Sequence, residues 1–213
     1  MASCLGLYIE SNLIKYAKVT KEREVLKVES FGIKFYDRLS DAISQIISET
    51  YSYKIPISVN LSEEMYNYFY MFSLLNKNDL KKAIETEFES YCSDKNINKN
   101  AYEGRYALAT VPEDKDKLKV IYVSANKAAI NKAIQLTDDV KATCVTSIGT
   151  SIANVASIKP KENIIIVNIE DNTTITTVVN QKVYNIEKID EGSEETSLVN
   201  RFFIEKLKEL CSN

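Results

Sequence analysis

The sequence contains no histidine. This absence excludes catalytic triads built on a histidine base, and it excludes metal sites with imidazole ligands. Any general base would have to be an aspartate, glutamate, lysine or tyrosine side chain. We therefore expect no metal site in this protein.

Glycine, proline and long apolar runs are also scarce. Only five glycines and three prolines occur among 213 residues, which argues against long flexible linkers. No window approaches 18 consecutive apolar residues, so no membrane span is predicted. The first residues, Met1–Cys4, do not form a basic segment followed by an apolar stretch, so we expect no secretory signal.

Basic residues do not cluster along the chain. The net charge is −3, and no basic stripe with interleaved aromatic residues occurs, so nucleic acid is not an expected partner. The four cysteines, Cys4, Cys92, Cys144 and Cys211, are widely spaced. This spacing is typical of reduced cytosolic thiols, and not of a disulfide framework or a zinc site. A cytoplasmic location is therefore expected.

One strand-turn-strand pattern occurs twice, about 160 residues apart in the chain. The first copy covers residues 5–19 and the second covers residues 165–179. Each copy has an apolar run, a short polar turn and then an alternating strand. The repeat predicts two related lobes that each contain one such hairpin.

The first sixty residues predict a three-strand meander, a helix and a fourth strand. The helix is indicated by apolar residues at spacings of three and four, from Leu39 to Ile47. The expected elements are the strands Leu5–Ile9, Ile14–Val19, Val25–Phe35 and Ile55–Asn60, with the helix Asp37–Tyr51 before the last strand.

Residues 63–137 differ in composition from the preceding residues, because aromatic residues are concentrated there. Within the helix of this region, Leu80, Ile84 and Phe88 should face inward, and Asn78 is the expected N-cap. We predict a separate α+β insert. Its expected elements are the strands Tyr66–Phe72, Tyr102–Val111 and Leu118–Ser124 and the helices Asn78–Tyr91 and Asn126–Leu136.

The rest of the chain predicts a second three-strand meander between helices. The predicted division is residues 1–62 for a first lobe, 63–137 for the insert and 138–213 for a partial second lobe. The expected elements are the strands Lys141–Val145, Asn163–Ile169, Thr173–Val179 and Lys182–Ile189 and the helices Ser147–Ser157 and Thr196–Leu210.

This order, with two hairpins and an insert between them, resembles the actin-like (ribonuclease H-like) α/β fold. In particular it resembles the PilM family of type IV pilus assembly proteins and its relative FtsA. In the first hairpin, Ser11, Ile14 and Lys15 agree with the family pattern, while Tyr8 and Glu10 replace its aspartate and glycine.

Two further segments carry the resemblance. The helix Asp79–Tyr91 is similar to a helix of the family's insert and is the most specific local match. The segment Asn168–Thr174 resembles Asp-Ile-Gly-Asp-x-Thr-Thr, with Asn168 and Glu170 in place of the first aspartate and the glycine. The family continues for a further sublobe, so this chain is expected to be a fragment or a shortened relative.

The resemblance implies a nucleotide site, but the substitutions oppose it. A glutamate where phosphate should approach the backbone adds a side chain and a negative charge. Loss of both aspartates removes the groups that would orient Mg²⁺ and water. We therefore predict no ATP hydrolysis and no catalytic residue, with ATP and Mg²⁺ at most as residual ligands. The degenerate nucleotide loops would contain Ser11, Asn12, Lys15, Asp171, Thr173 and Thr174.

The resemblance also implies a protein partner. In the family, a groove beside the insert receives the cytoplasmic N-terminal tail of a membrane protein, PilN. The expected function is therefore a scaffold of a type IV pilus or related type II secretion complex, peripheral to the inner face of the cell membrane, which could also couple to a motor ATPase. An aromatic face on one strand is the expected binding surface, formed by Tyr66, Tyr68, Tyr70 and Phe72.

Two alternatives stay open at this stage. One is an active nucleotide-binding ATPase or kinase of the same fold. The other is a polymerising cytoskeletal protein like FtsA, to which the position of the insert points.

Overall fold

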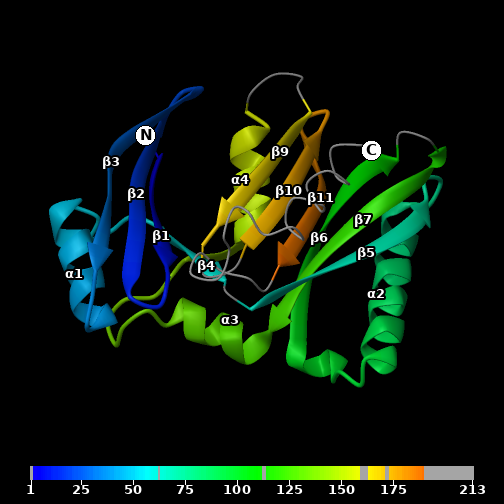
Figure 1. The fold of residues 1–213 in the computed structure, drawn as a ribbon, viewed down its shortest axis with the longest axis horizontal. Helices are drawn as coiled ribbons and strands as arrows, with labels where there is room; N and C mark the ends of the chain where they lie inside the picture. The colour runs from blue at the N-terminus through cyan, green and yellow to red at the C-terminus, as the bar shows by residue number, and fades with distance from the viewer. Residues whose placement is uncertain (1, 62, 112–113, 159–162, 171–172, 190–213) are drawn as a thin grey trace, which may run out of the picture. The chain divides into compact units, whose positions relative to one another are not determined.

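The structure, a computed structural model, describes residues 2–61, 63–111, 114–158, 163–170 and 173–189 (Figure 1). The chain divides into two units, residues 1–151 and residues 152–213, and each unit is described by itself. No helix in the described ranges is both long enough and apolar enough to cross a membrane.

The first unit contains a five-stranded sheet with the strand order β3-β2-β1-β4-β8. The first three strands form an antiparallel meander, whereas β4 runs parallel to both β1 and β8. The strands are β1 (Ala2–Ile9), β2 (Leu13–Glu22), β3 (Val25–Phe35), β4 (Ile57–Leu61) and β8 (Cys144–Ser147).

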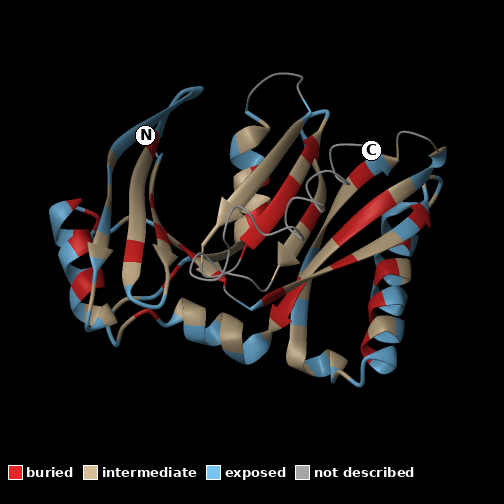
Figure 2. Ribbon diagram, in the orientation of Figure 1, coloured by how far each residue is buried: buried red, intermediate tan, exposed pale blue. Residues whose placement is uncertain are grey.

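One face of this sheet packs on helix α1 (Leu39–Glu49). Side chains that alternate along the strands, such as Leu5, Leu7 and Ile14, meet Ile43 and Ile46 of the helix, and all five are at most 3% exposed. The 3–4 spacing of the helix and the period of two of the strands therefore produce one shared core. Figure 2 shows this buried stripe on the inner side of α1.

The chain then leaves the first sheet and builds the insert. Its three strands have the order β5-β7-β6, and helix α2 covers one face of them. Leu80, Ile84 and Phe88 of α2 are buried as predicted. The elements are β5 (Glu64–Phe72), α2 (Lys77–Asp94), a 3₁₀ turn (Lys99–Ala101), β6 (Tyr102–Val111), β7 (Asp114–Asn126) and α3 (Lys127–Ile134).

One glycine of the insert lies beneath an aromatic ring. A Cβ added at Gly104 would lie 2.5 Å from the ring of Tyr122 on the neighbouring strand β7. That ring is held in place, because its centroid lies 4.6 Å from the ring of Phe88 on α2. The absence of a side chain at Gly104 therefore leaves room for the packing of α2 on the sheet.

Helix α4 (Ile148–Ala156) leads from the first unit into the second. The second unit contains an antiparallel meander with the order β11-β10-β9. Its strands are β9 (Ile164–Ile169), β10 (Thr173–Val179) and β11 (Lys182–Ile189). Both copies of the repeated pattern thus form antiparallel hairpins, as the sequence predicted.

Two local expectations are corrected by the structure. The predicted N-cap at Asn78 is wrong, because α2 begins one residue earlier and the side chain of Asn76 accepts the N–H groups of Asn78 and Asp79. The strand expected at Lys141–Val145, within the second lobe, is found at Cys144–Ser147 and pairs with β4 in the first sheet.

The expected helix Thr196–Leu210 lies outside the described residues. The predicted division of the chain at residues 62 and 137 stays a prediction.

Candidate functional site

The turn of the first hairpin is closed by backbone hydrogen bonds. The N–H of Glu10 donates to the carbonyl oxygen of Leu13 at 2.9 Å, and the N–H of Tyr36 donates to the carbonyl of Asn12 at 3.1 Å. The hydroxyl of Tyr36 also donates to the carbonyl of Glu10. These backbone groups therefore already have partners within the protein.

The side chains of the turn form an ion pair. The ammonium of Lys15 lies 2.9 Å from a carboxylate oxygen of Glu10, and the side chain of Glu10 is only 10% exposed. The same ammonium lies 5.5 Å from the ring centroid of Tyr8, which is directly opposite Lys15 in the β1–β2 register. Because a buried carboxylate is costly without a cation, Lys15 balances the charge of Glu10.

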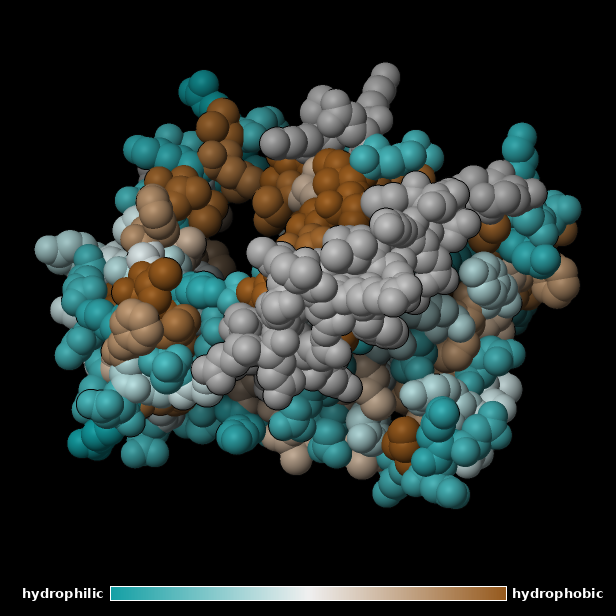
Figure 3. Space-filling model, viewed as in Figure 1, coloured by the Kyte–Doolittle hydropathy of each residue, from teal (hydrophilic) through white to brown (hydrophobic). Residues whose placement is uncertain are grey.

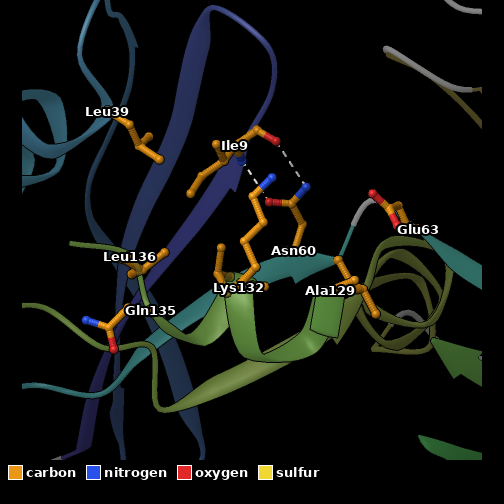
Figure 4. A pocket seen from close by; sticks show the side chains of 11 residues that line it. Ile9, Leu39, Asn60, Glu63, Ala129, Lys132, Gln135 and Leu136 are labelled. Atoms are coloured by element: carbon orange, nitrogen blue, oxygen red, sulfur yellow. Dashed lines mark hydrogen bonds between the residues drawn. The ribbon is translucent and has the colours of Figure 1, made fainter. Parts of the chain in front are cut away.

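An asparagine fastens this hairpin to the next strand. The Oδ1 of Asn60 accepts the N–H of Ile9 at 2.7 Å, and its Nδ2 donates to the carbonyl of Ile9 at 3.2 Å. The ends of β1 and β4 are thus held side by side by both halves of one amide group (Figure 4).

A cavity of about 230 Å³ opens next to this asparagine. It lies at the carboxyl ends of the parallel strands β1 and β4, where open α/β sheets commonly bind ligands. Its apolar wall comes from Ile9, Leu39, Val59, Leu61, Ala129, Ala133 and Leu136, and its polar groups from Asn60, Glu63, Lys132 and Gln135.

The polar groups of this cavity differ in whether a hydrogen bond within the protein already occupies them. The amide of Asn60 is occupied by Ile9, and the amide nitrogen of Gln135 donates to the carbonyl of Thr137. Glu63 and Lys132 are exposed side chains of opposite charge. The cavity therefore has an apolar wall with one carboxylate and one ammonium available to a bound group.

The second hairpin has a different character. Thr173 and Thr174, both predicted site residues, are at most 4% exposed, and Asn168 pairs with Thr174 across β9 and β10. Glu170 follows β9 at the start of the turn. Asp171 lies outside the described residues. Both threonines are therefore buried and not exposed in a turn.

The predicted partner strand contains two kinds of tyrosine. The hydroxyl of Tyr66 donates to the buried carboxylate of Glu64 at 2.7 Å and lies 2.8 Å from the hydroxyl oxygen of Ser147. Burial raises the pKa of Tyr66 far above its ordinary value, and the neighbouring Glu64 carboxylate raises it further. Tyr66 is thus part of an internal network that joins β5 to the start of α4.

The other three predicted residues of that strand differ in exposure. The ring of Tyr68 lies 4.8 Å from the ammonium of the buried Lys119. Tyr70 and Phe72, at the far end of β5, are 59% and 70% exposed. None of these four predicted residues lines the cavity.

Of the predicted site residues in the first hairpin, Lys15 lies in a cluster with Tyr8 and Glu10, the two residues that replace the family's aspartate and glycine. The predicted site residues Ser11 and Asn12 are exposed in the adjoining turn. Sequence reasoning missed Asn60 and Lys132. The sequence did contain a signal for Asn60. This residue ends a strand that was expected to follow the meander.

No protein-family model matches this sequence, and no curated protein sequence matches it. Solved structures do resemble it. A chain of the PilM–PilN type IV pilus biogenesis complex superposes with a TM-score of 0.71 at 12% identity, over 90% of this chain and 62% of that chain. The fold is actin-like.

A second structure has the same architecture. The cytoplasmic domain of EpsL, an inner-membrane component of the type II secretion system of Vibrio cholerae, superposes with a TM-score of 0.53 at 12% identity. The match covers 89% of this chain and 71% of that domain. The resemblance to PilM that the sequence predicted is thus confirmed for the fold. This chain spans about three fifths of the length of the PilM–PilN complex chain that it matches.

Proposed function

We propose that this protein is a catalytically silent scaffold of a type IV pilus or type II secretion complex, and that it holds the tail of an inner-membrane partner. The observation that carries the proposal is the ion pair between Glu10 and Lys15, whose ammonium lies over the ring of Tyr8. In the resembled family, this turn approaches the phosphates of a nucleotide.

The charge arrangement in the first turn disfavours a nucleotide. Lys15 is the cation that could meet a phosphate, but Glu10 already occupies it at 2.9 Å. A carboxylate near a phosphate costs about 1–4 kcal/mol per close charge pair in partly wet surroundings. The backbone N–H of Glu10 is also bonded to Leu13, so it cannot donate to an anion without opening the turn.

Titration calorimetry with MgATP tests this half of the proposal. We expect no heat of binding to the unmodified protein at low-millimolar MgATP. Restoring the family's residues with Tyr8→Asp, Glu10→Gly, Asn168→Asp and Glu170→Gly together should strengthen any binding, because the variant removes two carboxylates from the turns and restores the aspartates. Micromolar affinity of the unmodified protein, about −8 kcal/mol, would instead favour the active ATPase or kinase.

The cavity supplies a docking site for a partner's tail. The similar solved complex contains PilN as well as PilM, and EpsL is an inner-membrane component. In our proposal an apolar side chain of the tail enters beside Ile9 and Leu61, while Lys132 and Glu63 at the mouth contact its polar neighbours. A short tail loses conformational freedom on binding, so micromolar affinity is the expected strength.

Binding of a synthetic tail peptide tests this second half. The probe is the cytoplasmic N-terminal segment of a membrane protein that is encoded beside this one. Ala129→Glu places a charge in the cavity wall and should weaken binding at least about tenfold, because a carboxylate would have to be buried. Ala128→Glu is the matched control, since Ala128 is exposed on the same helix and does not line the cavity.

The same titration distinguishes the cavity from the predicted aromatic face. Tyr70→Glu should leave the affinity unchanged if the tail binds in the cavity. A loss of binding in Tyr70→Glu with full binding in Ala129→Glu would move the docking site to β5. If no tail from the neighbouring genes binds to the well-folded protein, the scaffold proposal in this form is wrong.

A further inference from the structure

Strand β3 is an edge strand of the first sheet and carries six exposed apolar side chains. One of them, Val25, is the first residue of the strand and lies beside the β2–β3 turn, opposite Glu22. The other five are spread over residues 26–35. Leu26, Val28, Phe31, Ile33 and Phe35 are between 55% and 79% exposed. Two of them have even numbers and three have odd numbers, so a regular strand would divide them between its two faces.

A β-bulge brings these five side chains onto one face. Val28 pairs with Val19 and Ser30 pairs with Lys18, so Glu29 is an extra residue with no opposite partner. Beyond the bulge, Phe31, Ile33 and Phe35 pair with Ala17, Lys15 and Leu13 of β2, and before it Leu26 and Val28 pair with Lys21 and Val19. All five partners have odd numbers on one regular strand, so they share a face.

This face is the side of the sheet opposite α1. Ile14 of β2 points to α1 and is fully buried in the core, and its neighbours Leu13 and Lys15 therefore point away from it. The other side of β3 carries Lys34, whose ammonium bonds to Gln45 and Glu49 of α1. Within residues 26–35 the bulge thus separates a polar side that faces the helix from an apolar side that faces solvent.

We infer that this apolar stripe, residues 26–35 of β3, is the contact surface for a second copy of the same chain. Figure 3 shows apolar side chains gathered over the β2–β3 part of the sheet. The five side chains expose on the order of 600 Å² of surface, whereas a standard interface buries about 800 Å² on each partner. The flanking side chains of β2 can supply the difference.

The order of side chains along the stripe fits a two-fold axis. The aliphatic residues Leu26 and Val28 lie at one end, and Ile33 and Phe35 lie at the other. When two stripes cross antiparallel about Phe31, Leu26 of one copy meets Phe35 of the other, and Val28 meets Ile33. Each large side chain then packs on a smaller one, which is the self-complementarity that an isologous dimer requires. The dimer is closed and does not grow into a filament.

Sedimentation equilibrium of the full chain tests this inference. We expect a dimer at about 100 µM protein and a dissociation constant at least about thirtyfold higher for Phe31→Glu, since a charge would be buried near the axis. Leu74→Glu is the matched control, because Leu74 is 92% exposed in the insert and lies outside the stripe. A circular dichroism spectrum like that of the unmodified protein establishes that Phe31→Glu is folded.

Chemical cross-linking gives a second measurement. In a background with Cys4→Ser, Cys144→Ser and Cys211→Ser, which keeps only the buried Cys92, Phe31→Cys should form a 31–31 cross-link between copies with a bismaleimide about 10 Å long, the spacing of packed sheets. Tyr53→Cys, at another exposed aromatic position, should not. A monomer at all concentrations, a dimer that persists in Phe31→Glu, or equal cross-linking at residues 31 and 53 would overturn the inference.

Discussion

At the scale of single residues, the contact between Gly104 and Tyr122 controls how closely α2 packs on the insert sheet. Gly104→Ala should destabilise the protein by about 1–3 kcal/mol, because the added methyl group meets a ring that Phe88 holds in place. Urea denaturation measures the change.

Gly6→Ala is the control for this substitution. The nearest atom to its added Cβ is the carbonyl oxygen of Ala17 at 3.7 Å, an ordinary contact. We expect a change below about 1 kcal/mol there. Equal effects at the two glycines would mean that the Tyr122 ring moves aside without cost.

Cys4 and Cys144 should differ in their reactivity toward alkylating reagents. Burial raises the pKa of the Cys4 thiol, and the nearby Cys144 raises it further. The thiolate of Cys4 therefore forms only at higher pH than in an ordinary cysteine, for which the pKa is about 8.5. At pH 8, iodoacetamide should modify the exposed Cys144 faster than Cys4, and peptide mass spectrometry measures both rates.

The pH dependence of the alkylation rate at Cys4 tests the direction of this pKa shift. The rate at Cys4 should keep rising above pH 8.5, and Cys144→Ser should shift its midpoint to lower pH by removing the second thiolate. Burial remains in that variant, so the midpoint should still exceed that of a free thiol. A midpoint below 8.5 in the unmodified protein would show that Cys4 is not buried as described.

At the scale of elements, the start of α2 depends on Asn76. Its side chain accepts two backbone N–H groups of the first turn, which would otherwise lack partners within the helix. Asn76→Ala should cost about 1 kcal/mol of stability, and thermal or urea unfolding measures it. Asn78→Ala, two residues later and exposed, should change stability by less than about 0.5 kcal/mol. The reverse ranking would restore the cap that the sequence first indicated.

Local patterns predicted the elements that depend on local interactions. Val25–Phe35 and Thr173–Val179 were expected with the boundaries that the structure has, because alternating residues and charged or polar turns define them. The bulge at Glu29 was not predictable, because it depends on how β3 aligns with β2 and leaves the composition of the strand unchanged.

The candidate site was predictable in its first hairpin only. The substitutions at Tyr8 and Glu10 indicated a modified turn, and the structure places both beside Lys15. The cavity was missed because it combines the ends of β1 and β4 with helix α3, and these segments are distant in sequence. The periodicity of apolar residues within one helix or strand does not predict which distant segments lie next to it.

At the scale of the whole molecule, β8 completes the first sheet from outside the segment that was expected to form the first lobe. It pairs with β4 through Ser58–Leu61, and the N–H of Thr143 donates to the carbonyl of Ile57 at 2.7 Å. A protein truncated after residue 158 should therefore unfold cooperatively. One truncated after residue 140 should lose at least about 2 kcal/mol or fail to fold, since several ladder hydrogen bonds are missing.

Urea denaturation of the two truncated proteins, followed by circular dichroism, makes the comparison. Equal stability of both would show that β8 contributes nothing to the first sheet. If neither truncated protein folds, the first unit needs residues beyond 158.

The pairing of β4 with β8 also has a consequence for the newly made chain. The hydrogen bond from Ile57 to Thr143 spans 86 residues. A ribosome adds about 5–20 residues per second, so β4 waits about 4–17 s for the strand that covers it. Throughout that interval β4 presents an open edge, the feature that invites pairing with other chains. The insert is synthesised during the same interval, so rapid folding of its own sheet shortens the unstructured tether between the two strands.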